Sequence, residues 1–93
     1  MLTTNEYFDG KIKSIAYQSE TLPASVGVMT KGEYVFNTVD NEKMTVISGT
    51  LKIQLTNSNE INTYTAGQSF RVPAGDSFKV TVESDSSYLC LYG

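Results

Sequence analysis

The sequence contains no histidine and no tryptophan, and it has only one cysteine and two prolines among its 93 residues. Without histidine, the chain cannot build a metal site with imidazole ligands, and any proton donor must be a carboxylic acid, a phenol, water or the substrate itself. The single cysteine, Cys90, cannot form a disulfide within the chain and fits a reducing compartment. We therefore expect a cytoplasmic protein in which Cys90 is a buried structural thiol.

Positive charge and long apolar runs are also scarce. The formal net charge is −3, and the seven basic residues are scattered along the chain, whereas nucleic-acid binding needs a basic stripe. No apolar run approaches the roughly 18 residues of a membrane span, and the first residues lack the basic and apolar regions of a signal peptide. We expect neither nucleic acid nor a membrane among the partners.

The length of the chain fits a single domain that covers residues 1–93. A domain of this size buries a limited fraction of its surface, and this one has no disulfide to stabilise it. We therefore expect the chain to gain stability by forming a homodimer.

The apolar pattern is typical of β-strands. Apolar and polar residues alternate with a period of two through most of the sequence, and no stretch of ten or more residues has helical spacing. Turn-forming residue types separate the alternating segments. About eight short strands in this arrangement predict an all-β sandwich or barrel. The predicted strands are 11–17, 24–30, 32–38, 44–48, 50–55, 69–72, 77–82 and 88–92.

Two spaced motifs narrow this fold class. Residues 67–78 read G-x5-P-x-G-x2-F, which resembles the second cupin motif except that Phe78 stands in place of its histidine. Residues 42–49 read E-x6-G and match the end of the first cupin motif, with Gly32 as a candidate for its opening glycine. The glycines of both motifs can adopt the positive φ of tight turns. The resemblance implies a single cupin-type jelly-roll barrel, or double-stranded β-helix, of about eight or more strands.

This chain lacks most of the residues that bind the metal ion in cupins. The histidines of both motifs are absent, and Glu42 is the one motif ligand that remains. Glu42 and Asp40 together offer carboxylate oxygens to a hard cation, but such sites usually need six or more donors. We expect no metal and no other cofactor.

A closer resemblance rests on six segments, which are residues 5–15, 24–29, 32–36, 42–51, 64–67 and 87–92. In this order they resemble the small pyrimidine/purine nucleoside phosphorylases, over nearly the whole chain. The resemblance implies phosphorolysis: inorganic phosphate, as co-substrate, attacks the anomeric carbon of a nucleoside and releases the free base and ribose 1-phosphate. It also implies broad tolerance of purine and pyrimidine bases, without a metal.

Phosphorolysis needs a phosphate cradle, groups that hold the ribose beside an oxocarbenium-like centre, and help for the departing base. Glu42 is the candidate catalytic residue, because the cupin motif directs this carboxylate into the barrel. Lys11, Lys13 and Arg71 are the candidate phosphate ligands, because cations, above all a guanidinium fork, match phosphate oxygens. Aromatic rings can stack on any base, and hydroxyls can bind sugar oxygens. The candidate substrate-binding residues are Phe36, Thr45, Ser48, Phe78 and Tyr92.

Each candidate also has a structural alternative: a solvated surface charge, a core aromatic ring or a good strand former. Apart from the family resemblance, the residues indicate only a metal-free cupin, and this architecture serves binding modules and enzymes alike. A non-catalytic small-molecule or sugar-binding cupin, a metal-independent sugar-modifying cupin and a structural dimerisation domain therefore remain alternatives to a phosphorylase.

Overall fold

The chain folds into ten β-strands in two sheets, as described for residues 2–93 by a computed structural model. Within these residues, no helix is long and apolar enough to cross a membrane. The strands are β1 (Thr3–Tyr7), β2 (Ile12–Gln18), β3 (Pro23–Met29), β4 (Gly32–Asn37), β5 (Glu42–Ser48), β6 (Thr50–Leu55), β7 (Asn62–Thr65), β8 (Ser69–Val72), β9 (Ser77–Val82) and β10 (Ser86–Tyr92).

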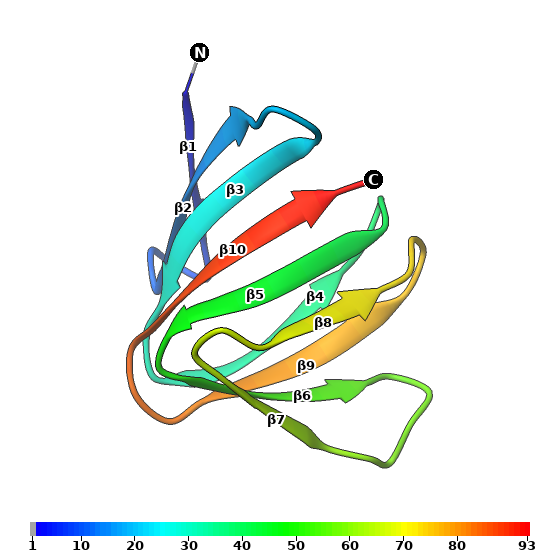
Figure 1. The fold of residues 1–93 in the computed structure, drawn as a ribbon. Helices are drawn as coiled ribbons and strands as arrows, with labels where there is room; N and C mark the ends of the chain where they lie inside the picture. The colour runs from blue at the N-terminus through cyan, green and yellow to red at the C-terminus, as the bar shows by residue number, and fades with distance from the viewer. Residues whose placement is uncertain (1) are drawn as a thin grey trace.

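The two sheets pack face to face, with one hydrophobic core between them (Figure 1). The large sheet has six strands in the order β1-β2-β3-β10-β5-β8, and the small sheet has four in the order β4-β9-β6-β7. All the pairings are antiparallel. The last strand, β10, lies between β3 and β5, so residues distant in sequence meet in the large sheet. The prediction of an all-β fold is confirmed.

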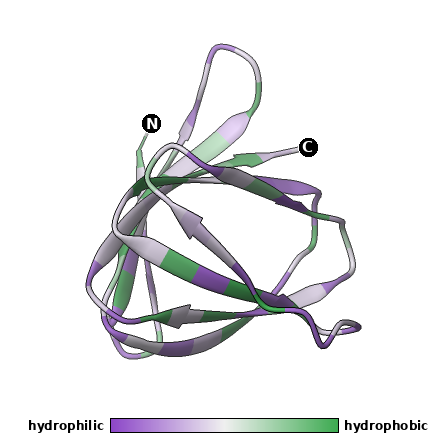
Figure 2. Cartoon of the chain, turned by 60° about the horizontal axis from the view of Figure 1, so that its bottom comes forward, coloured by the Kyte–Doolittle hydropathy of each residue, from purple (hydrophilic) through white to green (hydrophobic). Residues whose placement is uncertain are grey.

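Alternation along each strand decides which side chains enter the core. Figure 2 shows hydrophobic and hydrophilic residues alternating along the strands. On β9, for example, Phe78, Val80 and Val82 are buried, whereas the residues between them are more exposed. Cys90 is 1% exposed and belongs to the core, so the predicted buried thiol is confirmed. The other buried core residues are Ile12, Met29, Tyr34, Met44, Val46, Leu51, Ile53, Phe70, Val72 and Tyr88.

Sequence patterning did not predict β1 and β7, which brings the strand number from about eight to ten. Both are edge strands, since β1 lies beside β2 alone and β7 beside β6 alone. An edge strand that buries little surface needs no apolar face, and the sequences of these two, TTNEY and NTYT, have no regular apolar alternation. The eight predicted strands are all present, with ends displaced by two residues at most.

The motif glycines occupy turns that require positive φ. Their φ angles are 91° at Gly49, 88° at Gly67 and 73° at Gly75, a region that other residues adopt at a steric cost. At Gly49 a β-carbon would also collide with the hydroxyl of Ser86. The motif spacing therefore reflects backbone geometry, as the sequence predicted.

Candidate active site

A pocket of about 220 Å³ opens between the sheets, at the end of the barrel where β5 begins and β10 ends. We call it the barrel pocket. Its aromatic lining consists of Tyr7, Phe36, Phe78, Tyr88 and Tyr92. Its other lining residues are the carboxylates Asp40 and Glu42, the sulfur-containing Met29, Met44 and Cys90, and the two loop-side residues Asn37 and Val39.

Strand parity and register bring the central residues of the pocket together. Residues two apart on a strand share a face, so β5 directs Glu42 and Met44 inward, and β10 does the same with Tyr88, Cys90 and Tyr92. The two strands pair so that Tyr92 lies opposite Glu42 and Cys90 opposite Met44. Glu42 therefore sits among side chains that are almost fifty positions away in sequence.

Glu42 is a partly buried carboxylate with one thiol donor. The Sγ of Cys90 donates a hydrogen bond to Glu42 Oε1 at 3.5 Å. Burial raises the pKa of Glu42 above its ordinary value, and the nearby charge of Asp40 raises it further, while the bond from Cys90 opposes both. Glu42 is therefore a carboxyl group whose proton affinity is increased by its surroundings.

The side chains of β10 that surround Glu42 are neutral at physiological pH. Burial raises the pKa of both Tyr88 and Cys90 to about 12, and it also raises the pKa of Tyr92. The hydroxyls of Tyr92 and Ser25 are joined by a 2.8 Å hydrogen bond. The deep side of the pocket thus presents one ionisable carboxyl group among neutral hydrogen-bonding groups.

Aromatic rings form one wall of the barrel pocket. Phe36 on β4 stacks on Phe78 on β9, with ring centroids 5.6 Å apart and an angle of 24° between the rings. Tyr7 and Phe8 approach Phe36 edge-on, at 6.3 and 5.5 Å. Such a wall offers a ring face or edge to a flat ligand. It carries few polar groups that would select one base over another.

Four of the sequence candidates lie together in the barrel pocket. They are Glu42, Phe36, Phe78 and Tyr92, which come from four different strands. The carboxylate and the aromatic candidates therefore share one site. The structure gives them a common location, and their roles in a reaction remain predictions.

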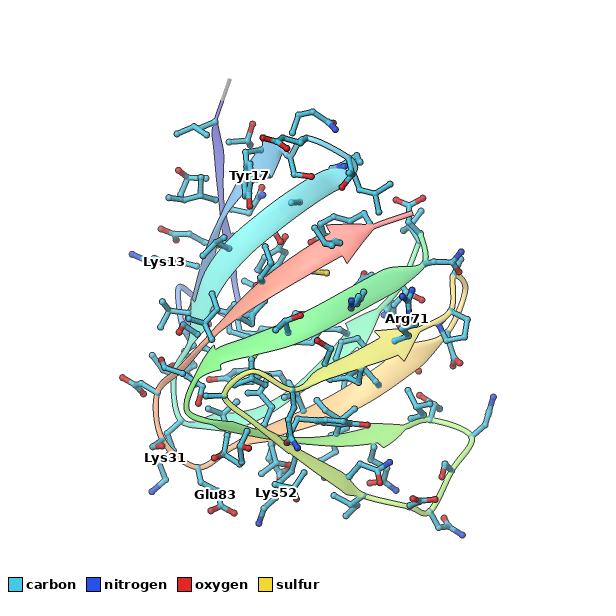
Figure 3. The ribbon with its side chains drawn as sticks, in the orientation of Figure 1. Lys13, Tyr17, Lys31, Lys52, Arg71 and Glu83 are labelled. Atoms are coloured by element: carbon cyan, nitrogen blue, oxygen red, sulfur yellow. The ribbon has the colours of Figure 1, made fainter. Side chains whose placement is uncertain are left out.

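The three candidate phosphate ligands lie elsewhere. Lys13 points outward from β2 and pairs with Glu6 at 3.5 Å, while Arg71 points outward from β8, and Lys11 is exposed before β2 (Figure 3). Four strand spacings separate β2 from β8, or about 19 Å, so Lys13 and Arg71 cannot hold one phosphate within this chain. Among residues 2–93, no lysine or arginine lines the barrel pocket.

Thr45 and Ser48 also lie outside the pocket. The hydroxyl of Thr45 bonds that of Ser69 at 2.7 Å, and the hydroxyl of Ser48 bonds that of Ser87 at 2.8 Å, both on the outer side of the large sheet. Thr45 is three positions from Glu42, and an odd separation on a strand puts two side chains on opposite faces. The structure therefore does not support a contact between these hydroxyls and a ligand in the barrel.

Some pocket residues had no signal in the sequence. Tyr7 enters from β1, whose polar sequence gave no strand pattern, and Met29 and Met44 looked like ordinary core residues. Asn37 and Val39 come from the end of β4 and the connection that follows it. Tyr88 was one of several aromatic residues in the sequence that could stack on a base. It has the same strand parity as Cys90 and Tyr92, and this parity would have predicted that it faces the interior of the barrel.

The residues of the barrel pocket do not fit the metal ion of other cupins. Phe78 occupies the histidine position of the second motif, is 1% exposed and packs on Phe36 and Phe70. Among residues 2–93, no group of three or more His, Cys, Asp or Glu side chains is arranged so that it could hold a metal ion. Asp40 and Glu42 supply fewer oxygen donors than a hard cation needs. We therefore assign no step to a metal.

The two antiparallel sheets packed face to face and the pocket at one end define a cupin-type barrel. An RmlC-like cupin from Shewanella frigidimarina shares this fold with a TM-score of 0.76, over 98% of this chain and 82% of that chain, at 21% identity. The predicted cupin architecture is confirmed.

The family model for pyrimidine/purine nucleoside phosphorylase matches residues 2–92, so the chain belongs to that family. A pyrimidine/purine nucleoside phosphorylase from Marinobacter nauticus is 53% identical over the full length of both chains. A crystal structure of a protein of unknown function from Vibrio parahaemolyticus has a TM-score of 0.96 and 38% identity, and the match covers 100% of this chain and 99% of that chain. The family resemblance seen in the sequence is confirmed.

Proposed function

We propose that this chain catalyses the phosphorolysis of purine and pyrimidine nucleosides in the barrel pocket, yielding free base and ribose 1-phosphate. The observation that carries the proposal is the single partly buried carboxylate, Glu42, facing an aromatic wall in a member of this family. The carboxylate can bind the ribose of a nucleoside, and the aromatic surface can stack on its base. The free thiol of Cys90 fits a cytoplasmic location.

The size of the pocket suggests how a nucleoside is held. Its volume of about 220 Å³ is below the about 300 Å³ at the lower end of ordinary ligand pockets, so part of the substrate remains at the mouth. The base lies against Phe36, whose other neighbour is the buried ring of Phe78, and a ring face accepts any base. The ribose lies beside Glu42. Broad base tolerance follows from stacking that lacks base-specific hydrogen bonds.

Glu42 acts in its ionised form. The carboxylate accepts hydrogen bonds from ribose hydroxyls and stabilises the positive charge that develops at the anomeric carbon as the bond to the base breaks. Its environment is partly desolvated, which strengthens this interaction compared with water. The thiol of Cys90 holds one carboxylate oxygen, Oε1, and so helps to fix its orientation.

Phosphate reaches the anomeric carbon from the open mouth, where the carboxylate of Asp40 on the pocket wall repels it and, among residues 2–93, no lysine or arginine attracts it. We therefore expect weak phosphate binding, with a KM above about 1 mM, the upper end of the usual range. The test measures release of uracil from uridine and adenine from adenosine against phosphate concentration. No release without phosphate, and saturation only at millimolar phosphate, is the expected result.

The same titration tests the main alternative. A cavity without a cationic side chain is also compatible with a protein that binds a neutral nucleoside or sugar without turning it over. Uridine binding detected by calorimetry without base release at any phosphate concentration would replace phosphorolysis by this binding function. Base release at a rate that does not depend on phosphate concentration would indicate hydrolysis.

The pH profile of kcat/KM should report the ionisation of Glu42. Because the ionised form is the active one, activity falls as pH drops through a pKa that burial and Asp40 have raised. Replacing Asp40 with asparagine removes one of these causes and should move the acid limb to lower pH. Phosphate also titrates, but its ionisation in solution is the same for both proteins. An acid limb that does not move in Asp40→Asn would contradict the assignment.

A further inference from the structure

Three residues form one row on the inner side of the large sheet. Gly27 on β3 lies directly opposite Ser14 on β2 and directly opposite Tyr88 on β10, and these three strands are neighbours (Figure 1). All three residues are buried, so the row faces the interior of the barrel. Because glycine has no side chain, Gly27 leaves an open place in the inner surface of the sheet.

The far end of the Tyr88 ring occupies this place. A β-carbon on Gly27 would lie 2.6 Å from the hydroxyl oxygen of Tyr88, and 2.7 and 2.8 Å from the ring carbons Cζ and Cε1. Carbon atoms in contact stay about 3.5–4.0 Å apart, so the ring can take this position only over a glycine. Gly27 is also the one glycine among residues 2–93 without a positive φ angle. The ring of Tyr88, and not the backbone conformation, therefore explains the glycine at this position.

The hydroxyl end of Tyr88 is held at β2. Burial raises the pKa of Tyr88 to about 12, and a side-chain hydrogen bond with Ser14 opposes this effect. Ser14 is itself 4% exposed, so this bond lies inside the barrel. The ring therefore extends from β10 across β3 to β2, and its polar end is already bonded there.

Tyr7 connects the Tyr88 ring with the aromatic wall of the barrel pocket. Tyr7 lies close enough to Tyr88 to raise its pKa further, and its ring meets that of Phe36 edge-on at 6.3 Å. Tyr88 belongs to the large sheet and Phe36 to the small sheet, and both line the pocket. Among residues 2–93, Tyr88 pairs with no other aromatic ring. Its ring is therefore free to receive a flat ligand from the pocket.

We propose that the ring of Tyr88 is the second stacking surface for the base, on the opposite side from Phe36, and that Gly27 positions this ring. The proposal rests on the function proposed above, because it takes the base of a nucleoside as the ligand. One face of the ring packs on Gly27, and the other is open to the pocket. A base between two aromatic residues is recognised by its π faces, whatever groups its edge carries. The site therefore selects flat bases over puckered rings of similar size.

The first test compares Tyr88→Phe with Tyr88→Leu by calorimetry with uracil and adenine, without phosphate. Tyr88→Phe keeps the ring and removes only the hydroxyl, so it should bind both bases nearly as tightly as the wild-type protein. Tyr88→Leu keeps an apolar side chain without a ring, and it should raise both dissociation constants by about 5–150-fold, the usual effect of losing one stacking contact. Equal affinities of the two variants would overturn the proposal, as would a wild-type protein that binds neither base.

Dihydrouracil is the matched control ligand, because it keeps the carbonyl and N–H groups of uracil but has a puckered ring. The wild-type protein and Tyr88→Phe should bind it more weakly than uracil. In Tyr88→Leu this preference should shrink, because the surface that recognises flatness is lost. A change that only loosened the core would weaken both ligands equally, and an unchanged preference in Tyr88→Leu would contradict the stacking role.

Gly27→Ala tests the positioning role. The added β-carbon displaces the Tyr88 ring from the sheet into the pocket, so the dissociation constants of uracil and adenine should rise by about 5–150-fold. In a protein that already carries Tyr88→Leu, the same change should add little, because the colliding ring atoms are gone. Circular dichroism checks the fold of each variant, and the comparison of Tyr88→Phe with Tyr88→Leu holds even if Gly27→Ala does not fold. A folded Gly27→Ala protein with wild-type affinity would overturn the role of Gly27.

These binding measurements separate the stacking role from the proposed function, because they require no turnover. A protein that shows the expected affinities but releases no base from uridine or adenosine would contradict phosphorolysis and support the role of Tyr88. Phosphate-dependent base release by the wild-type protein, together with equal affinities of Tyr88→Phe and Tyr88→Leu, would support phosphorolysis and overturn the role of Tyr88.

Discussion

Glu42→Gln is expected to lower kcat for phosphorolysis by about 10²–10³-fold, the usual cost of removing one electrostatic contact made in the transition state. Glutamine keeps the shape of the side chain but cannot balance positive charge at the anomeric carbon. The fold should survive, because the substitution removes a charge that burial already disfavours. The amide oxygen can still accept the hydrogen bond from Cys90.

The matched control for this variant is Glu60→Gln, which makes the same chemical change at an exposed residue outside the barrel pocket. Its kcat should equal that of the wild-type protein, and urea titration of both variants should show wild-type unfolding. Unchanged turnover in Glu42→Gln would return this carboxylate to a structural role. An equal loss in the control would show that the effect is not specific to the pocket.

Phe78→Ala should lower the free energy of unfolding by about 3–5 kcal/mol, the usual cost of truncating a buried phenylalanine. Phe78 is 1% exposed and contacts Phe36 and Phe70, at 5.6 and 6.2 Å between ring centroids. Because small domains have only about 5–15 kcal/mol of stability, this loss should leave a marginally folded protein. The stacked wall of the barrel pocket would be lost together with the packing.

Equilibrium urea unfolding measures this change, with Val35→Ala as the control. Val35 is 57% exposed on the outer side of the small sheet, so its truncation should change stability by less than about 0.5 kcal/mol. A change of less than about 1 kcal/mol for Phe78→Ala would mean that the ring contributes little to the core. That result would remove the physical reason for a phenylalanine at this motif position.

Much of the fold is readable from the sequence because alternation and turn chemistry are local. The strand with Phe78, Val80 and Val82 was predicted with its buried face, since burial on one side leaves a period-two pattern. The edge strands left no such pattern. The order of the strands was not readable either, because the register that brings Cys90 to Glu42 is set by contacts 48 residues apart.

The sequence predicted those residues of the candidate site whose positions follow from a motif or from alternation along a strand. Glu42 and Phe78 both belong to cupin motifs, and both line the barrel pocket. Thr45 was chosen for its chemistry and its nearness in sequence to Glu42, but its position on the strand turns it to the other face. Lys13 and Arg71 were grouped because their side chains match phosphate oxygens, and side-chain chemistry does not reveal that four strand spacings separate β2 from β8.

The fate of the ribose tests the central proposal most directly. Phosphorus NMR of a reaction containing uridine or adenosine and phosphate should show one ribose 1-phosphate formed for each base released. The same signal should appear for the purine and the pyrimidine nucleoside, and Glu42→Gln should slow it as strongly as it slows base release. Free ribose as the product, or base release in buffer without phosphate, would contradict phosphorolysis in the barrel pocket.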